Sequence, residues 1–244
     1  MLKKLLFTVL AICLGAQMAV AKEIVFAVDA TWPPMEFVNS EKEIVGYSID
    51  FMTAAAEEAG FTPVFKNVAW DGIFAGLAGG NYDAICSSVS ITEERKEAMD
   101  FSEPYFQVQQ ALVVPKDVEA KTLEDLEGEP VGAQIGTTGY FTIKDDGAPE
   151  PKSYDEIGLA MQDLLNGRLA GVVCDDPVAA NYAKQEEGFS DALKIAAILE
   201  SDTEEYYGIA LKKGNEDLLK LINKGIRAVK DKGLDAELRA KWIE

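Results

Sequence analysis

Charged and aromatic residues stand at points of the sequence where they could hold a small polar molecule. Arg95 could grip a carboxylate with the paired N–H groups of its guanidinium, and Asp175 could hold an ammonium group. Trp32 and Trp70 could stack on an aliphatic, planar or cationic group. These residue types predict a binding site for a zwitterion.

The composition excludes several classes of chemistry. The chain of 244 residues has no histidine, which excludes a Ser-His-Asp triad, a Cys-His pair and a His-ligated zinc ion. Lys and Arg number 23 against 42 Asp and Glu, a net charge of −19, so we expect no binding to nucleic acid. The pairs Glu93-Glu94 and Glu186-Glu187 are adjacent in sequence, so neither can face one pocket as a catalytic dyad. No metal site and no cofactor are predicted.

Residues 1–21 are predicted to be a secretory signal peptide. Lys3 and Lys4 precede an apolar run over residues 5–15, and Ala19-Val20-Ala21 forms a cleavage site. A lipid anchor at Cys13 is the alternative, but the bulky Ile12 precedes it where a small residue is needed. The rest of the chain contains no apolar run of about 18 residues. We therefore expect a soluble, monomeric, periplasmic protein.

The elements that must position the candidate residues alternate between strands and helices. In the first half, apolar runs and turn residues predict strands at residues 24–28, 63–68, 83–87 and 109–114. Helices are predicted at residues 49–59 and 72–77. A third helix is predicted from Thr92, because Ser90-Ile91-Thr92-Glu93 has the form of a capping box. This order predicts a mainly parallel sheet with helices on both faces.

The same rhythm restarts in the second half. Strands are predicted at residues 131–133, 171–174, 194–199 and 206–211, and helices at 122–126, 157–165, from Pro177, and at 216–242 with a break at Gly233. A second capping box is predicted at Ser153-Tyr154-Asp155-Glu156. Two α/β lobes fit this order better than one sheet. The ligand is expected beyond the carboxyl ends of the strands, in the cleft between the lobes.

Two cysteines, Cys86 and Cys174, remain after export. An oxidising compartment would permit a disulfide between them. Each ends an apolar run, however, which is typical of a buried thiol. We predict two free cysteines in different lobes.

Five motifs, taken in order, resemble those of the extracellular solute-binding protein family 3, the periplasmic receptors of polar amino-acid ABC importers. They are DATWPP at 29–34, WDG at 70–72, SSVSITEERK with DFSEPY between 87 and 105, GTTG at 136–139 and CDDP at 174–177. The resemblance covers essentially the whole chain after residue 21. It implies the two-lobed type II periplasmic-binding-protein fold, an α/β fold with the ligand cleft between the lobes. Lobe 1 would comprise residues 22–108 and 205–244, lobe 2 residues 109–204, and the hinges would lie near 107–110 and 202–206.

The resemblance also assigns the two ends of an amino acid to particular residues. Arg95 would bind the ligand's α-carboxylate, assisted by the Ser90 hydroxyl and the Thr138 main-chain N–H. Asp175 and the Ser88 carbonyl would accept the α-ammonium. The neighbouring Asp176 leaves the choice of aspartate open.

Four further residues would surround the ligand's side chain. Trp32 and Trp70 match the aromatic walls, and Asp29 matches the acidic residue at the far end of a polar or cationic side chain. Gln134 stands where the family varies with the ligand. This set favours a cationic ligand, arginine ahead of lysine, with glutamine or another polar amino acid as the alternative.

Two classes of function follow. The first is a receptor without enzymatic activity, which closes over a free L-amino acid and delivers it to a membrane permease. The second is an enzyme on the same fold, of the cyclohexadienyl-dehydratase type. That reaction needs a general acid aimed at a leaving hydroxyl, and no residue of the sequence marks one. The receptor is therefore the predicted function.

Overall fold

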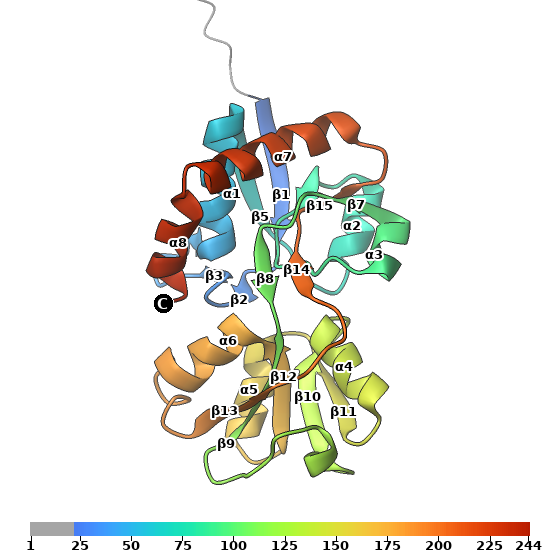
Figure 1. The fold of residues 1–244 in the computed structure, drawn as a ribbon, viewed down its shortest axis with the longest axis vertical. Coiled ribbons are helices and arrows are strands. Elements are labelled where there is room, and N and C mark those ends of the chain that lie inside the picture. The colour runs from blue at the N-terminus through green and yellow to red at the C-terminus, as the bar shows by residue number, and fades with distance from the viewer. Residues whose placement is uncertain (1–21) are drawn as a thin grey trace, which may run out of the picture.

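Two five-stranded sheets, each with helices packed around it, form two lobes in the computed structural model, which describes residues 22–244. The lobes lie one above the other in Figure 1, and the chain passes between them through a narrow middle region. This is the two-lobed α/β architecture predicted above. The predicted signal peptide lies outside the described residues.

The upper lobe in Figure 1, lobe 1, is built on a mixed sheet. Its strand order is β5 (Phe61–Asn67), β1 (Lys22–Val28), β6 (Ala84–Ile85), β15 (Ala210–Lys212) and β7 (Met99–Phe101). β1 is parallel to β5 and β6, whereas β15 is antiparallel to β6 and β7. Four of the five strands therefore run in the same direction, which confirms the predicted mainly parallel sheet, and the exception is β15, a strand from the C-terminal part of the chain.

Five helices surround the sheet of lobe 1. They are α1 (Tyr47–Ala59), α2 (Ile73–Gly79), α3 (Glu93–Ala98), α7 (Glu216–Asp231) and α8 (Leu234–Trp242). α1 and α7 pack side by side. α1 buries Phe51, Met52, Ala55 and Ala56, the apolar positions of its helical repeat. α7 and α8 are separated at Gly233, as predicted.

Lobe 2, the lower lobe, has a second mixed sheet. Its order is β11 (Glu150–Tyr154), β10 (Pro130–Gln134), β12 (Gly171–Asp175), β9 (Gln110–Pro115) and β13 (Leu193–Ile198). β10 is parallel to β11 and β12, whereas β9 is antiparallel to β12 and β13. Around it lie α4 (Thr138–Asp146), α5 (Ile157–Leu165), α6 (Asp176–Ala180), a 3-10 turn at Glu124–Leu126 and a π-helical turn at Asn181–Gln185.

The second capping box was predicted wrongly. Ser153 lies in β11, where Ala133 of β10 is its partner, and the N-cap of α5 is Glu156, whose side chain makes no capping hydrogen bond. The first capping box was also predicted wrongly, because Thr92 and not Ser90 is the N-cap of α3, although the helix begins near Thr92 as predicted. The Thr92 hydroxyl accepts a hydrogen bond from the Arg95 N–H at 3.2 Å.

A two-stranded ribbon connects the lobes. β8 (Phe106–Val108) pairs antiparallel with β14 (Glu205–Tyr207), and β8 leads directly into β9 of lobe 2. The two predicted hinge segments overlap these strands. A movement of one lobe against the other would therefore pass through backbone close to β8 and β14.

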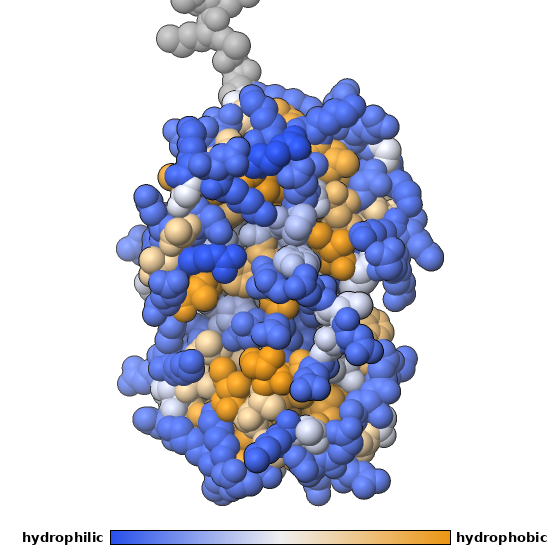
Figure 2. Space-filling view, viewed as in Figure 1, coloured by the Kyte–Doolittle hydropathy of each residue, from blue (hydrophilic) through white to orange (hydrophobic). Residues whose placement is uncertain are grey.

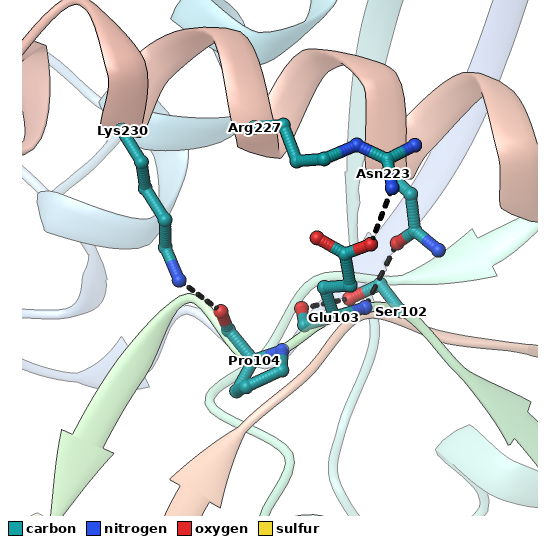
Figure 3. Close-up of polar contacts among 6 residues, drawn as sticks. All are labelled: Ser102, Glu103, Pro104, Asn223, Arg227 and Lys230. Atoms are coloured by element: carbon teal, nitrogen blue, oxygen red, sulfur yellow. Dashed lines mark hydrogen bonds and ion pairs between the residues drawn. The ribbon is translucent and has the colours of Figure 1, made fainter.

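Helix α7 holds the loop that leads into this ribbon (Figure 3). The Glu103 N–H donates to Asn223 Oδ1 at 2.8 Å, and Arg227 pairs with the Glu103 carboxylate at 2.7 Å. Lys230 donates to the Pro104 carbonyl at 2.6 Å. The loop is thus fixed to lobe 1 immediately before the chain crosses to lobe 2.

A small three-stranded sheet that the sequence did not predict lies at the edge of lobe 1. It consists of β2 (Thr31–Trp32), β3 (Glu36–Val38) and β4 (Ile44–Val45), in that order. Trp32 and Glu36 are direct partners across β2 and β3. The hairpin therefore carries both side chains to the same place.

The two cysteines are free and buried, as predicted. Cys86 follows β6 of lobe 1 and Cys174 lies in β12 of lobe 2. Burial raises the pKa of both thiols well above the usual range. Both side chains therefore behave as small apolar residues.

The surface in the view of Figure 2 is mostly hydrophilic, and hydrophobic residues gather on the lower lobe. Single large apolar side chains such as Phe141 and Ile198 are partly exposed there. Within residues 22–244, every helix is too short or too polar to span a bilayer.

Candidate ligand-binding site

A cavity lies between the two lobes. Both lobes contribute to its wall, which is the usual place for a small-molecule site in such a fold. Its lining consists of Asp29, Trp32, Glu36, Trp70, Ser87, Ser88, Ser90, Arg95, Gln134, Thr137, Thr138 and Asp175. All nine residues predicted from the sequence are in this set.

The ends of the strands bring these residues together. Asp29 follows β1, and Ser88 follows β6 in lobe 1. Gln134 ends β10 and Asp175 ends β12 in lobe 2. The carboxyl ends of these strands face the cavity, as the rule for open α/β sheets requires.

Arg95 spans the two lobes. Its guanidinium donates to the Ser90 carbonyl at 2.9 Å and to the Gly136 carbonyl of lobe 2 at 3.1 Å. It lies 5.6 Å from the Trp70 ring centroid and 5.3 Å from that of Phe74. Burial lowers the pKa of Arg95, while the negative charge of Glu205 opposes this shift. A fixed cation is thereby held at the wall of the cavity.

The GTTG motif shapes the start of α4. Gly136 has a positive φ of 69°, which a side chain would strain, and the Thr137 hydroxyl caps the helix through the Tyr140 N–H at 3.2 Å. A Cβ at Gly139 would come within 2.9 Å of Gln110 Oε1 and 3.0 Å of the Val173 carbonyl. The two glycines therefore let the first turn of α4 lie against β12 at the cavity.

Asp175 receives hydrogen bonds from three side chains. Its Oδ1 accepts from Gln110 at 2.6 Å, and its Oδ2 accepts from the Trp32 indole at 3.2 Å and from the Tyr207 hydroxyl. Burial, together with the charge of Glu205, raises the pKa of Asp175 to about 7. The neighbouring Asp176 instead accepts from the Gln109 N–H at 2.9 Å and does not line the cavity. Of the two aspartates, Asp175 is the one that lines the cavity.

Asp29 and Gln134 form a second pair across the lobes. Gln134 donates from Nε2 to Asp29 Oδ2 at 2.9 Å and to the Asp155 carbonyl at 2.8 Å. Both amide hydrogens are thus used, which leaves Gln134 Oε1 as an acceptor. Burial raises the pKa of Asp29.

Glu205 was not among the residues predicted for the site, yet it is central to the contact between the lobes. Its Oε1 accepts from the hydroxyls of Ser90 at 2.5 Å and Thr138 at 2.7 Å, and its Oε2 accepts from Gln110 at 3.0 Å. Glu205 is one of several acidic residues between 200 and 205, and nothing in the sequence separates it from the others.

Two other residues of this region were also missed, and each left a weak signal. Gln110 is a polar residue at the start of the apolar strand β9. Glu36 is a lone carboxylate between Met35 and Phe37, and it is fully buried at the cavity. A charged residue inside an apolar run is a signal that could have been followed.

The family of the chain follows from comparison with known sequences. The family described as bacterial extracellular solute-binding proteins, family 3, matches residues 24–244. The chain belongs to this family. The predicted family is thereby confirmed.

Two relatives of this family 3 protein carry names that refer to amino acids. It is 35% identical to the probable histidine-binding protein of Neisseria gonorrhoeae over 221 residues, covering 89% of this chain and 81% of the relative. It is 33% identical to the ABC transporter arginine-binding protein 1 of Escherichia coli (strain K12), over 99% of both chains.

Solved structures of similar proteins have the same fold. An ancestral arginine-binding protein bound to arginine is 37% identical to this family 3 protein, with a TM-score of 0.84 over 92% of this chain and all of the other. The ancestral amino acid-binding protein AncCDT-1, a precursor of cyclohexadienyl dehydratase, is 31% identical, with a TM-score of 0.82 over 91% and 95%.

Proposed function

We propose that this protein is the receptor of an amino-acid ABC importer and that it binds a cationic amino acid, arginine ahead of lysine. The observation that carries the proposal is the charge of the cavity. One guanidinium, that of Arg95, faces the same space as the carboxyl groups of Asp29, Glu36 and Asp175. An arginine or lysine ligand offers the complementary set, one carboxylate and two cationic groups.

Each end of the ligand has a partner in this proposal. Arg95 binds the α-carboxylate, with Ser90 and Thr138 beside it, and Asp175 accepts the α-ammonium with Ser88. Asp29 accepts from the cationic end of the side chain, which lies between Trp32 and Trp70. The names of the relatives and of the arginine-bound structure support a ligand of this class.

A dehydratase is the second candidate, because Asp175 has a pKa of about 7, which suits a general acid. The geometry argues against it. Gln110, Trp32 and Tyr207 all donate to Asp175, and these hydrogen bonds favour its ionised form over the acid that would have to protonate a leaving hydroxyl. We therefore infer a receptor without enzymatic activity. Turnover of prephenate or arogenate by the purified protein would overturn this inference.

We further propose that the protein works in the periplasm as a monomer, after removal of residues 1–21, and delivers its ligand to a membrane permease. Membership of an extracellular solute-binding family supports the location. Intact mass of the secreted protein tests it. A chain that begins at Lys22 is expected, whereas a lipid on Cys13 or a retained leader would contradict the proposal.

The ligand is tested by thermal shift across the twenty amino acids, followed by calorimetry on those that bind. Arginine should give the largest rise in melting temperature. Asp29→Asn should weaken arginine more than glutamine, because only arginine loses an ion pair. Asp71→Asn is the control, since Asp71 is exposed and does not line the cavity. If glutamine or glutamate binds at least tenfold more tightly than arginine, the proposal of a cationic ligand is wrong.

A further inference from the structure

Two aromatic rings of lobe 1 lie against the guanidinium of Arg95. The Arg95 Cζ atom is 5.3 Å from the ring centroid of Phe74 and 5.6 Å from that of Trp70. Both distances fall within the limit of about 6 Å at which an aromatic ring attracts a cation. The two rings meet edge to face, with centroids 5.0 Å apart and an interplanar angle of 78°. Trp70 and Phe74 thus form an aromatic corner beside Arg95.

The turn before α2 and the first turn of this helix build the aromatic corner. Gly72, the N-cap of α2, has a positive φ of 107°, and the Ile73 N–H donates to the Trp70 carbonyl at 3.1 Å. Ile73 and Leu77 anchor the helix in the core. Trp70 is buried as well, whereas Phe74 is half-buried. Phe74 does not line the cavity, so any contribution that it makes to binding acts through another residue.

The aromatic rings attract the guanidinium without occupying its N–H groups. A guanidinium has five N–H donors, and Arg95 donates to the Ser90 carbonyl at 2.9 Å and to the Gly136 carbonyl at 3.1 Å. Within residues 22–244, no carboxylate forms an ion pair with Arg95. A carboxylate at that place would compete with a ligand for the remaining donors, whereas a ring leaves them open.

The aromatic corner belongs to lobe 1, as do Arg95 and Ser90. The Gly136 carbonyl belongs to lobe 2, so a separation of the lobes would remove its hydrogen bond to Arg95. The two rings and the Ser90 carbonyl would stay beside the guanidinium. A guanidinium that is already held in an open cleft loses less conformational entropy when a ligand binds.

We propose that Phe74 is a positioning residue, which with Trp70 holds the Arg95 guanidinium in place for the ligand's α-carboxylate before the lobes close. The proposal rests on the proposed function, because it assumes that Arg95 binds a ligand carboxylate. It does not depend on the side chain of the ligand. Phe74, which lies outside the five sequence motifs, should therefore contribute equally to the binding of every amino acid that the protein accepts.

The test is Phe74→Leu, which removes the ring and keeps an apolar side chain. Calorimetry should show that arginine and lysine both weaken about three- to tenfold, with the ratio of their affinities unchanged. Phe74→Tyr keeps the ring and should bind both within about twofold of wild type. Phe65→Leu is the matched control and should bind as wild type does. Phe65 is another half-buried ring of lobe 1, which packs on Phe26 and does not line the cavity.

Three results of these titrations would overturn the proposal. Affinities of Phe74→Leu within about twofold of wild type would show that the ring does not support binding. A loss confined to arginine would place Phe74 at the ligand's side chain instead of its carboxylate. Equal weakening by Phe74→Tyr and Phe74→Leu would show that the aromatic ring is not the group that matters.

A second measurement needs no ligand. If Phe74 acts on Arg95, Phe74→Leu should lower the melting temperature less in an Arg95→Met background than in wild type, because the cation is already absent. Equal falls in the two backgrounds would overturn the proposal. Phe74→Met takes the place of Phe74→Leu if the latter does not fold, and loss of folding in both would show that the ring serves the fold instead. Failure of the proposed function looks different, because the wild-type protein would then bind no amino acid while the melting temperatures still report the contact.

Discussion

Trp32 and Asp175 lie in different lobes, yet the Trp32 indole donates a hydrogen bond of 3.2 Å to Asp175 Oδ2. The bond joins an aromatic wall of the cavity to the predicted acceptor of the α-ammonium. It exists only while the lobes lie together. The same pair therefore links ligand contact to the arrangement of the lobes.

Trp32→Phe keeps an aromatic ring and removes this hydrogen bond. A hydrogen bond to a charged group contributes about 1.5–3 kcal/mol, so we expect affinity for the amino acid to fall roughly tenfold or more. Trp242→Phe is the control, because it removes a similar bond of 2.8 Å from an indole to Asp50, at a site outside the cavity. Equal affinities for the two variants in calorimetry would show that the bond between the lobes does not matter for binding.

Arg95→Ala should abolish measurable binding of every α-amino acid. The variant leaves the ligand carboxylate buried without its partner, and loss of one side of such a pair removes about 2–5 kcal/mol of binding free energy. Arg227→Ala is the control and should bind as wild type does, because Arg227 is largely exposed and does not line the cavity. Binding by Arg95→Ala within threefold of wild type would remove Arg95 from the site.

Affinity should rise with pH between about 5.5 and 8. The pKa of Asp175 is raised to about 7 from its ordinary value of 3.8, and the α-ammonium needs the ionised form. Binding should also release protons, which calorimetry in buffers of different ionisation enthalpy detects. An affinity that is flat across this range would contradict the assignment of Asp175.

Without ligand, the melting temperature should show the opposite trend. A carboxyl group with a raised pKa holds its proton in the folded state, so its stabilising contribution is complete below pH 3.8 and is lost as pH rises through about 7. Glu205→Gln removes the charge that helps raise this pKa. The midpoint of the fall in melting temperature with rising pH should therefore shift to lower pH. Glu204→Gln, an exposed neighbour that contacts Tyr206, should leave it in place.

The loop held by α7 offers a test of stability away from the cavity. Asn223→Ala leaves the Glu103 N–H without its partner and should reduce the free energy of unfolding by about 1–2 kcal/mol. Arg227→Ala breaks a half-exposed ion pair and should reduce it by less than about 1 kcal/mol. Denaturant unfolding measures both, and a larger effect for Arg227→Ala would contradict this ranking.

The thiols give a simple check on the packing of each lobe. Because Cys86 and Cys174 are buried and have raised pKa values, neither should react with a thiol reagent in the folded protein. After denaturation without reductant, two thiols should react in the secreted chain. Fewer than two would indicate a disulfide, and rapid reaction in the folded state would indicate that one lobe is loosely packed.

The position of the candidate site could be predicted because strand ends can be read from the sequence. Asp29, Ser88, Gln134 and Asp175 each end or follow an apolar run, and parallel strands bring such ends to one edge. Glu205 could not be predicted in this way. It reaches the cavity because β14 pairs with β8, a contact between segments far apart in the chain.

The errors in the fold have the same origin. Ser153 has the local signature of a helix cap, but pairing of β11 with β10 draws it into a strand. Similarly, residues 206–211 were predicted to form one strand. In the structure this segment belongs to two strands, with Tyr207 in the connecting ribbon and Ala210 in the sheet of lobe 1, and no local signal in the sequence marks the division. In both cases, strand pairing with a distant segment of the chain outweighed the local preference of the residues.

The place of β15 has a consequence for how the chain acquires its structure. This strand sits inside the sheet of lobe 1, between β6 and β7, whereas the sheet of lobe 2 uses only strands from residues 110–198. As the chain emerges N-terminus first, its middle therefore meets all of its sheet partners before its beginning does. Until residues 210–212 emerge, β6 and β7 lack the strand that pairs with both of them. Their apolar side chains would remain exposed and accessible to chaperones during that time.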